Sequence, residues 1–161
     1  MIIIGEKING AIPSIKTAIA ERNEALIIER TLAQAAAGAN FLDCAPSTAT
    51  EIEYETMVWL IGLMQGATDV PLCIDSPNAK LLARIIEEGH LKRPGMVNSV
   101  NEEGDKCETI FPLIAGTPWE VVGLTCDQEG IPADPTKKVE IAKRIIDKAV
   151  KYGVSLKQLH I

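Results

Sequence analysis

The sequence has few of the features that bring a protein to nucleic acid or into a membrane. Aromatic side chains make up 4% of the 161 residues, which leaves little for stacking on unpaired bases. Acidic residues outnumber basic ones by 22 to 16, so no basic face is available for phosphate or anionic lipid. Apolar runs such as 1–4 and 57–64 are far shorter than the roughly 20 residues that a membrane span needs. The composition therefore argues against nucleic acid and membrane partners.

Common metal, cofactor and export signals are also missing. The four cysteines, Cys44, Cys73, Cys107 and Cys126, are scattered without CxxC or CxH spacing, so they predict no metal site. Cys73 lies between apolar neighbours and is read as a core residue. The chain has neither GxGxxG nor GxxxxGK[ST], and its start has no basic flank or small-residue cleavage site. We therefore expect a cytoplasmic protein.

What the sequence does have is a regular alternation of short apolar and longer amphipathic segments. The short segments, expected to be strands, are 2–5, 40–43, 70–75, 95–98, 121–125 and 159–161. The amphipathic segments, expected to be helices, are 23–37, 51–65, 78–88, 103–115 and 136–152. Gly38, Gly89 and Gly153 follow three of these helices, where a left-handed cap is favoured. Strand followed by helix, repeated along the chain, predicts a parallel sheet buried on both faces.

The spacing of the segments predicts an α/β fold of the TIM-barrel type. Successive strands are separated by about 24 to 38 residues, as in a (β/α)8 barrel. Such a barrel needs eight strands, whereas the sixth expected strand has barely begun at Ile161. We therefore expect residues 1–161 to be the N-terminal part of a single barrel domain and to supply about its first five βα units. The alternative is that a partner chain covers the open edge of the sheet.

Polar residues gather where the expected strands end, which is where such barrels carry their chemistry. These residues are Glu6, Asn9, Asp43, Asp75, Ser76, Asn98, Ser99, Asn101, Thr125 and Asp127. For any one of them a helix cap or a turn is the alternative, above all for Asn101 and Asp127. Asp75 and Asn98 each end an apolar strand, so we expect their side chains to point into the mouth of the barrel.

The residue types at these positions indicate the kind of ligand. Lys7 is the one basic residue at an expected strand end, so a phosphate site is not indicated. Carboxylates and amides suit a neutral ligand rich in N–H donors, such as a fused aminopyrimidinone. One carboxylate can accept two adjacent N–H groups, and amide side chains can meet the remaining donor and acceptor needs.

Several segments, in the same order along the whole chain, resemble the methyltetrahydrofolate:corrinoid methyltransferases. They are GEKING (5–10), LDC (42–44), CIDS (73–76), MVNSVN (96–101), FPL (111–113) and GLT (123–125). This family belongs to the pterin-binding barrels, with dihydropteroate synthase and the folate domain of cobalamin-dependent methionine synthase. The first loop, NGAIPSIKTAI (9–19), is unlike the Ser-Phe-Ser-Asp-Gly run of dihydropteroate synthase.

The resemblance implies a site and an activity. Asp75 and Asn98 would bind the pterin, Asp43 would lie in the polar network around it, and a supporting group would comprise Glu6, Asn9, Ser99 and Asn101. The family's further pterin-binding aspartate and its catalytic asparagine are expected beyond Ile161. No catalytic residue is therefore expected within these residues, and the segment alone is expected to be inactive.

The implied reaction moves a methyl group, in either direction, between N5 of methyltetrahydrofolate and the cobalt of cobalamin on a corrinoid protein. The protein would bind no metal of its own. The family resemblance and the apolar segment 57–64 also suggest a homodimer. Three alternatives remain: a dihydropteroate synthase-like enzyme, a non-catalytic pterin-binding module, and an aldolase or decarboxylase barrel that uses Lys7. We read Lys7 as solvated.

Overall fold

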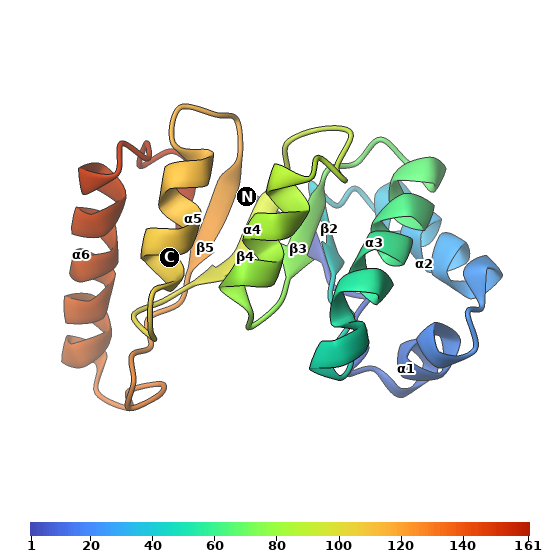
Figure 1. The fold of residues 1–161 in the computed structure, drawn as a ribbon, viewed down its shortest axis with the longest axis horizontal. Helices are drawn as coiled ribbons and strands as arrows, with labels where there is room; N and C mark the ends of the chain where they lie inside the picture. Colours follow the sequence, from blue (N-terminus) through green and yellow to red (C-terminus); the bar gives the residue numbers. More distant parts are fainter.

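The computed structural model describes all residues from 1 to 161 as a curved parallel sheet with helices along it (Figure 1). In chain order the elements are β1 (Ile4–Gly5), α1 (Pro13–Ala20), α2 (Glu24–Ala36), β2 (Phe41–Cys44), α3 (Thr50–Ala67), β3 (Leu72–Asp75), α4 (Ala79–Glu87), β4 (Met96–Val100), α5 (Lys106–Ile114), β5 (Glu120–Gly123), α6 (Pro135–Lys151) and β6 (Leu159–His160). The six strands lie side by side in sequence order, and every neighbouring pair is parallel. The expected strands and the five expected helices are all present, with ends that shift by a few residues.

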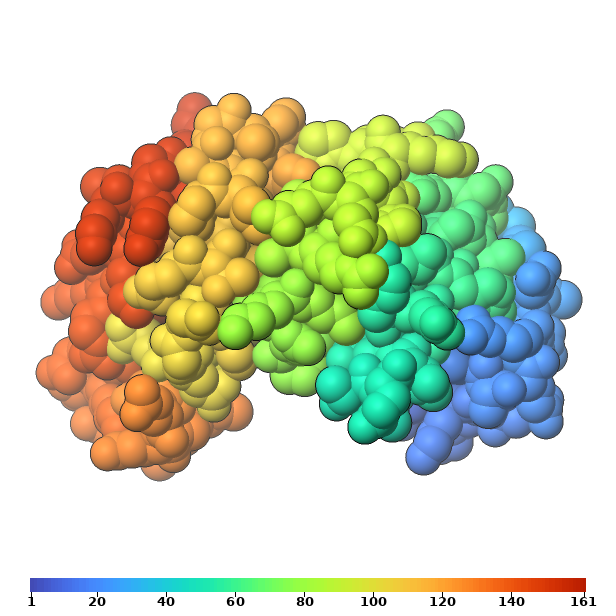
Figure 2. All heavy atoms as spheres, in the orientation of Figure 1, coloured from blue at the N-terminus to red at the C-terminus, as the bar shows by residue number.

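The main core lies between the sheet and the helices. Strand residues of one parity, among them Leu42, Ile74, Val97 and Val121, belong to this cluster and are at most 1% exposed. Figure 2 shows the helical face, where the side chains of successive helices pack against one another in chain order. The opposite, inner face of the sheet has its own small apolar cluster, described below. The two faces together make the architecture of a half-barrel.

Local signals explain where the helices begin and end. The side chain of Asn78 accepts a hydrogen bond from the Leu81 amide at 3.2 Å and caps α4. Asp134 caps α6 in the same way, and Pro135 occupies the first turn, where its missing N–H has no consequence. Gly89 and Gly153 follow α4 and α6 with φ values of 69° and 80°. The predicted left-handed caps are confirmed.

The sequence predicts a loop over residues 13–20, whereas the structure forms the helix α1 there. Residues 13–20 form two turns, begun by Pro13, that bury Ile15, Ala18 and Ile19. These three positions follow the helical spacing i, i+3, i+4. The helix α1 is short and lies between β1 and α2, so two helices follow the first strand. The prediction assumed one helix after each strand and therefore did not include it.

The apolar segment 57–64 contributes mostly to the core of this chain. Met57, Leu60, Ile61 and Met64 on α3 are at most 1% exposed. The prediction of a homodimer therefore gains nothing from this segment. None of the helices combines the length and apolar character that crossing a membrane requires.

Candidate functional site

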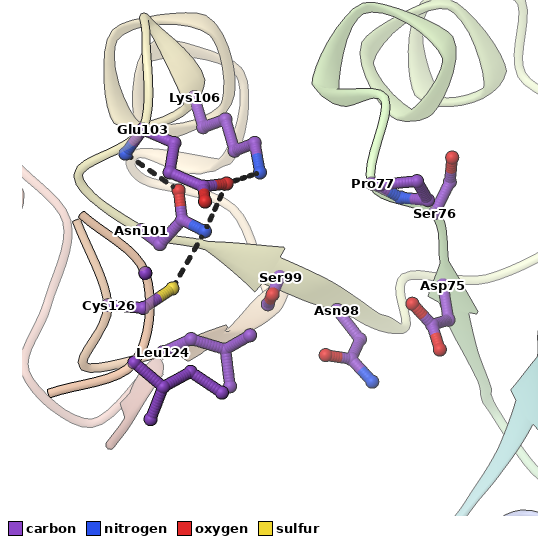
Figure 3. Close-up of a pocket in the computed structure, with 12 residues that line it drawn as sticks. Asp75, Ser76, Pro77, Asn98, Ser99, Asn101, Glu103, Lys106, Leu124 and Cys126 are labelled. Carbon is purple, nitrogen blue, oxygen red and sulfur yellow. Dashed lines mark hydrogen bonds and ion pairs between the residues drawn. The ribbon is translucent and has the colours of Figure 1, made fainter. Parts of the chain in front are cut away.

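Asp75 and Asn98 lie next to each other at the carboxyl ends of β3 and β4. They are register partners in the parallel sheet, so their side chains leave the same face of neighbouring strands. Figure 3 shows both side chains directed toward the same open space. Neither side chain has a hydrogen-bond partner within the protein, although both are partly buried. Their polar atoms are therefore available to a ligand.

The two residues line a cleft of about 540 Å³. Its wall comprises Asp75, Ser76, Pro77, Asn98, Ser99, Asn101, Glu103, Lys106, Leu124, Cys126, Gly130 and Ile131. Four of the seven residues predicted to bind or support the pterin, Asp75, Asn98, Ser99 and Asn101, thus come together in one place. Their roles toward a ligand stay predictions.

The turn after β3 is held by a residue that the sequence analysis missed. Glu53, on α3, is 6% exposed and accepts a hydrogen bond from the Ser76 hydroxyl at 2.6 Å. That hydroxyl also accepts from the Asn78 amide at 3.0 Å. Since Ser76 follows Asp75 directly, this contact fixes the backbone that carries the Asp75 carboxylate. No local signal marks Glu53, because its partner lies 23 residues away in the sequence.

The far wall of the cleft is a network around Asn101, which is 4% exposed. Its side-chain oxygen accepts from the Glu103 amide at 2.9 Å, and its side-chain nitrogen lies 3.1 Å from both Glu103 Oε2 and Cys126 Sγ. Lys106 Nζ donates to Glu103 Oε2 at 2.8 Å (Figure 3). The amide of Asn101 is thus engaged in shaping the loop after β4. Lys106 is a further residue missed from the sequence, because it begins a helix and does not end a strand.

Asp43 lies on the inner face of β2, with 1% of its surface exposed. Its Oδ1 atom is buried and has no hydrogen-bond partner. Burial, and then the neighbouring carboxylates of Asp75 and Glu6, raises the pKa of Asp43 to about 8. Burial, followed by Glu6 and Glu53, raises the pKa of Asp75 to about 6. The predicted acids therefore form one electrostatically coupled group.

The remaining predicted residues lie at the start of the chain. Asn9 forms an isolated bridge with Ala45 beyond β2, and its side-chain oxygen accepts from the Ala11 amide at 2.9 Å. Glu6 is exposed and acts on the two aspartates through its charge. Lys7 is exposed and lies outside the cleft, as expected.

Below the strand ends, the inner face carries an apolar floor and one polar pair. Phe41, Cys73 and Met96 form a buried cluster, against which Val122 packs. His160 Nε2 lies 2.5 Å from Glu120 Oε2, and both residues share the inward parity of Val122. The sequence analysis does not predict this pair, because it selects polar residues at the ends of strands. Glu120 and His160 lie within short strands.

The order and direction of the six strands define the fold class: an α/β fold with the arrangement of a partial (β/α) barrel, like that of the dihydropteroate synthases. Dihydropteroate synthase from Xanthomonas albilineans, solved with 7,8-dihydropteroate, matches 98% of the chain and 56% of its own length, with a TM-score of 0.62 and 18% identity. The enzyme from Burkholderia cenocepacia matches 98% of the chain and 54% of its own length, with a TM-score of 0.64 and 15% identity. At these identities the likeness concerns the fold alone.

Proteins of similar sequence give closer matches than these structures do. The methylcorrinoid:tetrahydrofolate methyltransferase of Eubacterium limosum is 46% identical over the whole chain, which spans 59% of that protein's length. Methionine synthase of Mycobacterium leprae is 33% identical over 71% of the chain, which corresponds to 10% of that protein. No model of a known protein family matches the chain. The resemblance to the methyltetrahydrofolate:corrinoid methyltransferases is confirmed, and the chain is a relative of these proteins over its whole length.

Proposed function

We propose that the barrel formed with this chain moves a methyl group between N5 of methyltetrahydrofolate and the cobalt of a corrinoid carried by a partner protein. The observation that carries the proposal is the Asp75–Asn98 pair, whose polar atoms have no partners in the protein and face one cleft. The 46% identity to a protein named for this reaction supports it.

The side chains suit the pyrimidinone edge of a pterin. The Asp75 carboxylate can accept hydrogen bonds from the ring N–H and the exocyclic amino group together, as carboxylates do with a guanidinium. Asn98 can both donate and accept, so it can bind a ring position that presents either kind of group. The buried cluster of Phe41, Cys73 and Met96 lies below these groups on the same face of the sheet. The edge of the flat ring thus meets one acceptor group and one amide.

The methyl group needs a nucleophile, and a corrinoid supplies it as cobalt(I), whose electron pair forms the new bond to carbon. The bonding pair of the broken bond stays on N5, so N5 must gain a proton or a strong hydrogen bond before the methyl group leaves. The residues of this chain hold the pterin and orient its methyl group. We expect the group that acts on N5 to come from outside these residues. The reverse reaction uses the same site, and the physiological direction is left open.

The proposal includes partners and location. A corrinoid protein must reach the mouth of the barrel, where the cleft beside Asp75 lies. A homodimer, a cytoplasmic location, and the absence of nucleic acid and membrane partners stay predictions.

The test is a methyl-transfer assay on a complete barrel that contains residues 1–161. Mixed with methyltetrahydrofolate and cob(I)alamin under reducing conditions, the protein should cause loss of the cob(I)alamin absorbance. Tetrahydrofolate without the methyl group is the control and should cause none. Condensation of a dihydropterin pyrophosphate with p-aminobenzoate would instead support a dihydropteroate synthase. Tight binding of methyltetrahydrofolate without transfer to any corrinoid would support a non-catalytic pterin-binding module.

A further inference from the structure

One side-chain oxygen of Asp43 is buried without a hydrogen-bond partner. The residue is 1% exposed, and the unpaired atom is Oδ1. An ionised carboxylate that is buried and unpaired is costly, and such a group lowers the cost by keeping a proton. The protonation state of Asp43 therefore depends on the charges around it.

Those charges are negative. Asp43 is in register with Cys73 on β3, and Asp75 lies two residues further on the same face of that strand. Glu6 follows β1 and adds a second carboxylate, and both acids disfavour ionisation of Asp43. Burial raises the pKa of Cys73, so its thiol adds no charge. Asn9 and Cys73 provide polar side chains that stabilise the ionised form only in part.

No cation compensates the group. Lys106, in the cleft wall, is bound to Glu103 at 2.8 Å, and Lys7 is exposed. Glu53, packed behind Asp75 from α3, adds another negative charge on that side. Two neighbouring carboxyl groups in such a setting titrate as a pair, and the first proton stays on the more deeply buried member.

We propose that Asp43 and Asp75 form a carboxyl pair that holds one proton, with Asp43 as the neutral acid and Asp75 as the carboxylate that receives the ligand. Asp43 is then a positioning residue: it is buried beside the cleft and not among the residues that line it, and its O–H is a donor next to a group of acceptors. This role rests on the proposed function, since it concerns the same pterin site. It goes beyond that function by assigning opposite hydrogen-bonding roles to two aspartates.

The pair predicts a window of pH for ligand binding. With pKa values of about 8 for Asp43 and about 6 for Asp75, the one-proton form dominates between these limits. Above the upper limit Asp43 loses its proton and the pocket gains a second negative charge. Affinity should then fall by up to about tenfold for each further pH unit. Below the lower limit Asp75 gains a proton and ceases to accept two N–H groups.

The experiment measures the affinity of a complete barrel that contains residues 1–161 for methyltetrahydrofolate, between pH 5 and pH 9, by calorimetry. Asp43→Asn imitates the neutral acid, so it should bind within about threefold of the parent at pH 7 and lose the alkaline decrease. Asp43→Ala removes the donor and should bind at least tenfold more weakly. The decrease in affinity at alkaline pH is the decisive measurement. At acid pH the ligand amine itself takes up a proton, which also changes the affinity.

Infrared spectroscopy of the ligand-free protein provides a second measurement that does not depend on binding. A carbonyl band of a protonated carboxylic acid should be present at pH 7, disappear in Asp43→Asn and persist in Asp75→Asn. A folded Asp43→Asn variant that binds more than tenfold more weakly at pH 7, or that keeps the alkaline decrease, would overturn the proposal, as would absence of the band. A parent protein that shows the band but never binds methyltetrahydrofolate would overturn the proposed function and leave the carboxyl pair standing.

Discussion

Asp75 on β3 and Asn98 on β4 are register partners that project from the same face of the sheet into one cleft. Parallel neighbours lie about 4.8 Å apart, so the two side chains can reach different groups of one small ligand. One side chain can only accept hydrogen bonds when ionised, whereas the other can donate and accept. The sheet thus places two side chains with different hydrogen-bonding capacities side by side on neighbouring strands.

Asp75 should be the dominant pterin contact among these residues. In Asp75→Ala the two ring donors lose their acceptor in a partly dry pocket, at a cost of about 1 to 3 kcal/mol each. We expect the affinity of a complete barrel containing residues 1–161 for methyltetrahydrofolate to fall at least tenfold, measured by calorimetry. Asp127→Ala is the matched control, since Asp127 binds the Glu129 amide in its own turn and lies outside the cleft. Unchanged affinity in Asp75→Ala would remove this assignment.

Asn98→Asp should weaken methyltetrahydrofolate binding more than Asn98→Ala does. The alanine loses the hydrogen bonds of the amide, whereas the aspartate also places a second negative charge beside Asp75. Equilibrium titration of both variants at pH 7 makes the comparison. A ligand-bound structure with the Asn98 side chain turned away from the pterin would contradict the prediction.

Glu53→Gln should change the pH dependence of the site without changing its shape. Glu53 raises the pKa of Asp75, so removing its charge should lower that pKa from about 6. The acid-side loss of methyltetrahydrofolate affinity should then begin at a lower pH. The glutamine can still accept the hydrogen bond from Ser76. Glu51→Gln, an exposed change one position from the start of the same helix, should leave the profile where it was.

Gln158→Ala should destabilise the fold next to β6. The side-chain nitrogen of Gln158 donates to the carbonyl oxygens of Ile114, Thr117 and Trp119, at 3.1, 2.9 and 2.7 Å. The Ile114 oxygen still accepts from Thr117, but the carbonyl oxygens of Thr117 and Trp119 lose this donor, which should cost about 1 to 3 kcal/mol, measured by urea denaturation. Gln128→Ala, at an exposed position, should cost less than about 0.5 kcal/mol. Equal midpoints for the two variants would show that the loop is held by other contacts.

The 161 residues expressed by themselves should associate and show no methyl transfer. Strands β1 and β6 each pair on one side only, and Ile3 and Ile161 beside them are 49% and 56% exposed. Joining the chain to the segment of the Eubacterium limosum relative that lies beyond the matched part should restore a monomeric or dimeric, active protein. Sedimentation and the cob(I)alamin assay measure both properties. Activity of the isolated residues would place the group that acts on N5 within them.

The sequence by itself determined the parts of this protein that depend on local pattern. Alternating apolar and amphipathic segments predicted the parallel sheet, and glycines after the helices predicted their left-handed caps. Asp75 and Asn98 could be selected because parallel strands bring their carboxyl ends to one side. The helix α1 was missed because it interrupts that alternation.

Only the tertiary structure decided the contacts that join distant residues. Glu53 meets Ser76 across 23 residues, and Glu120 meets His160 across 40. Neither pair produces a repeating pattern in the sequence, because the residues between the partners form helices and strands according to their own local preferences. The unpaired oxygen of Asp43 is also a product of the fold, since burial and neighbouring charge come from strands brought together by packing. Local patterns therefore specified which residues reach the mouth of the barrel, and packing determined which of them are charged, paired or free.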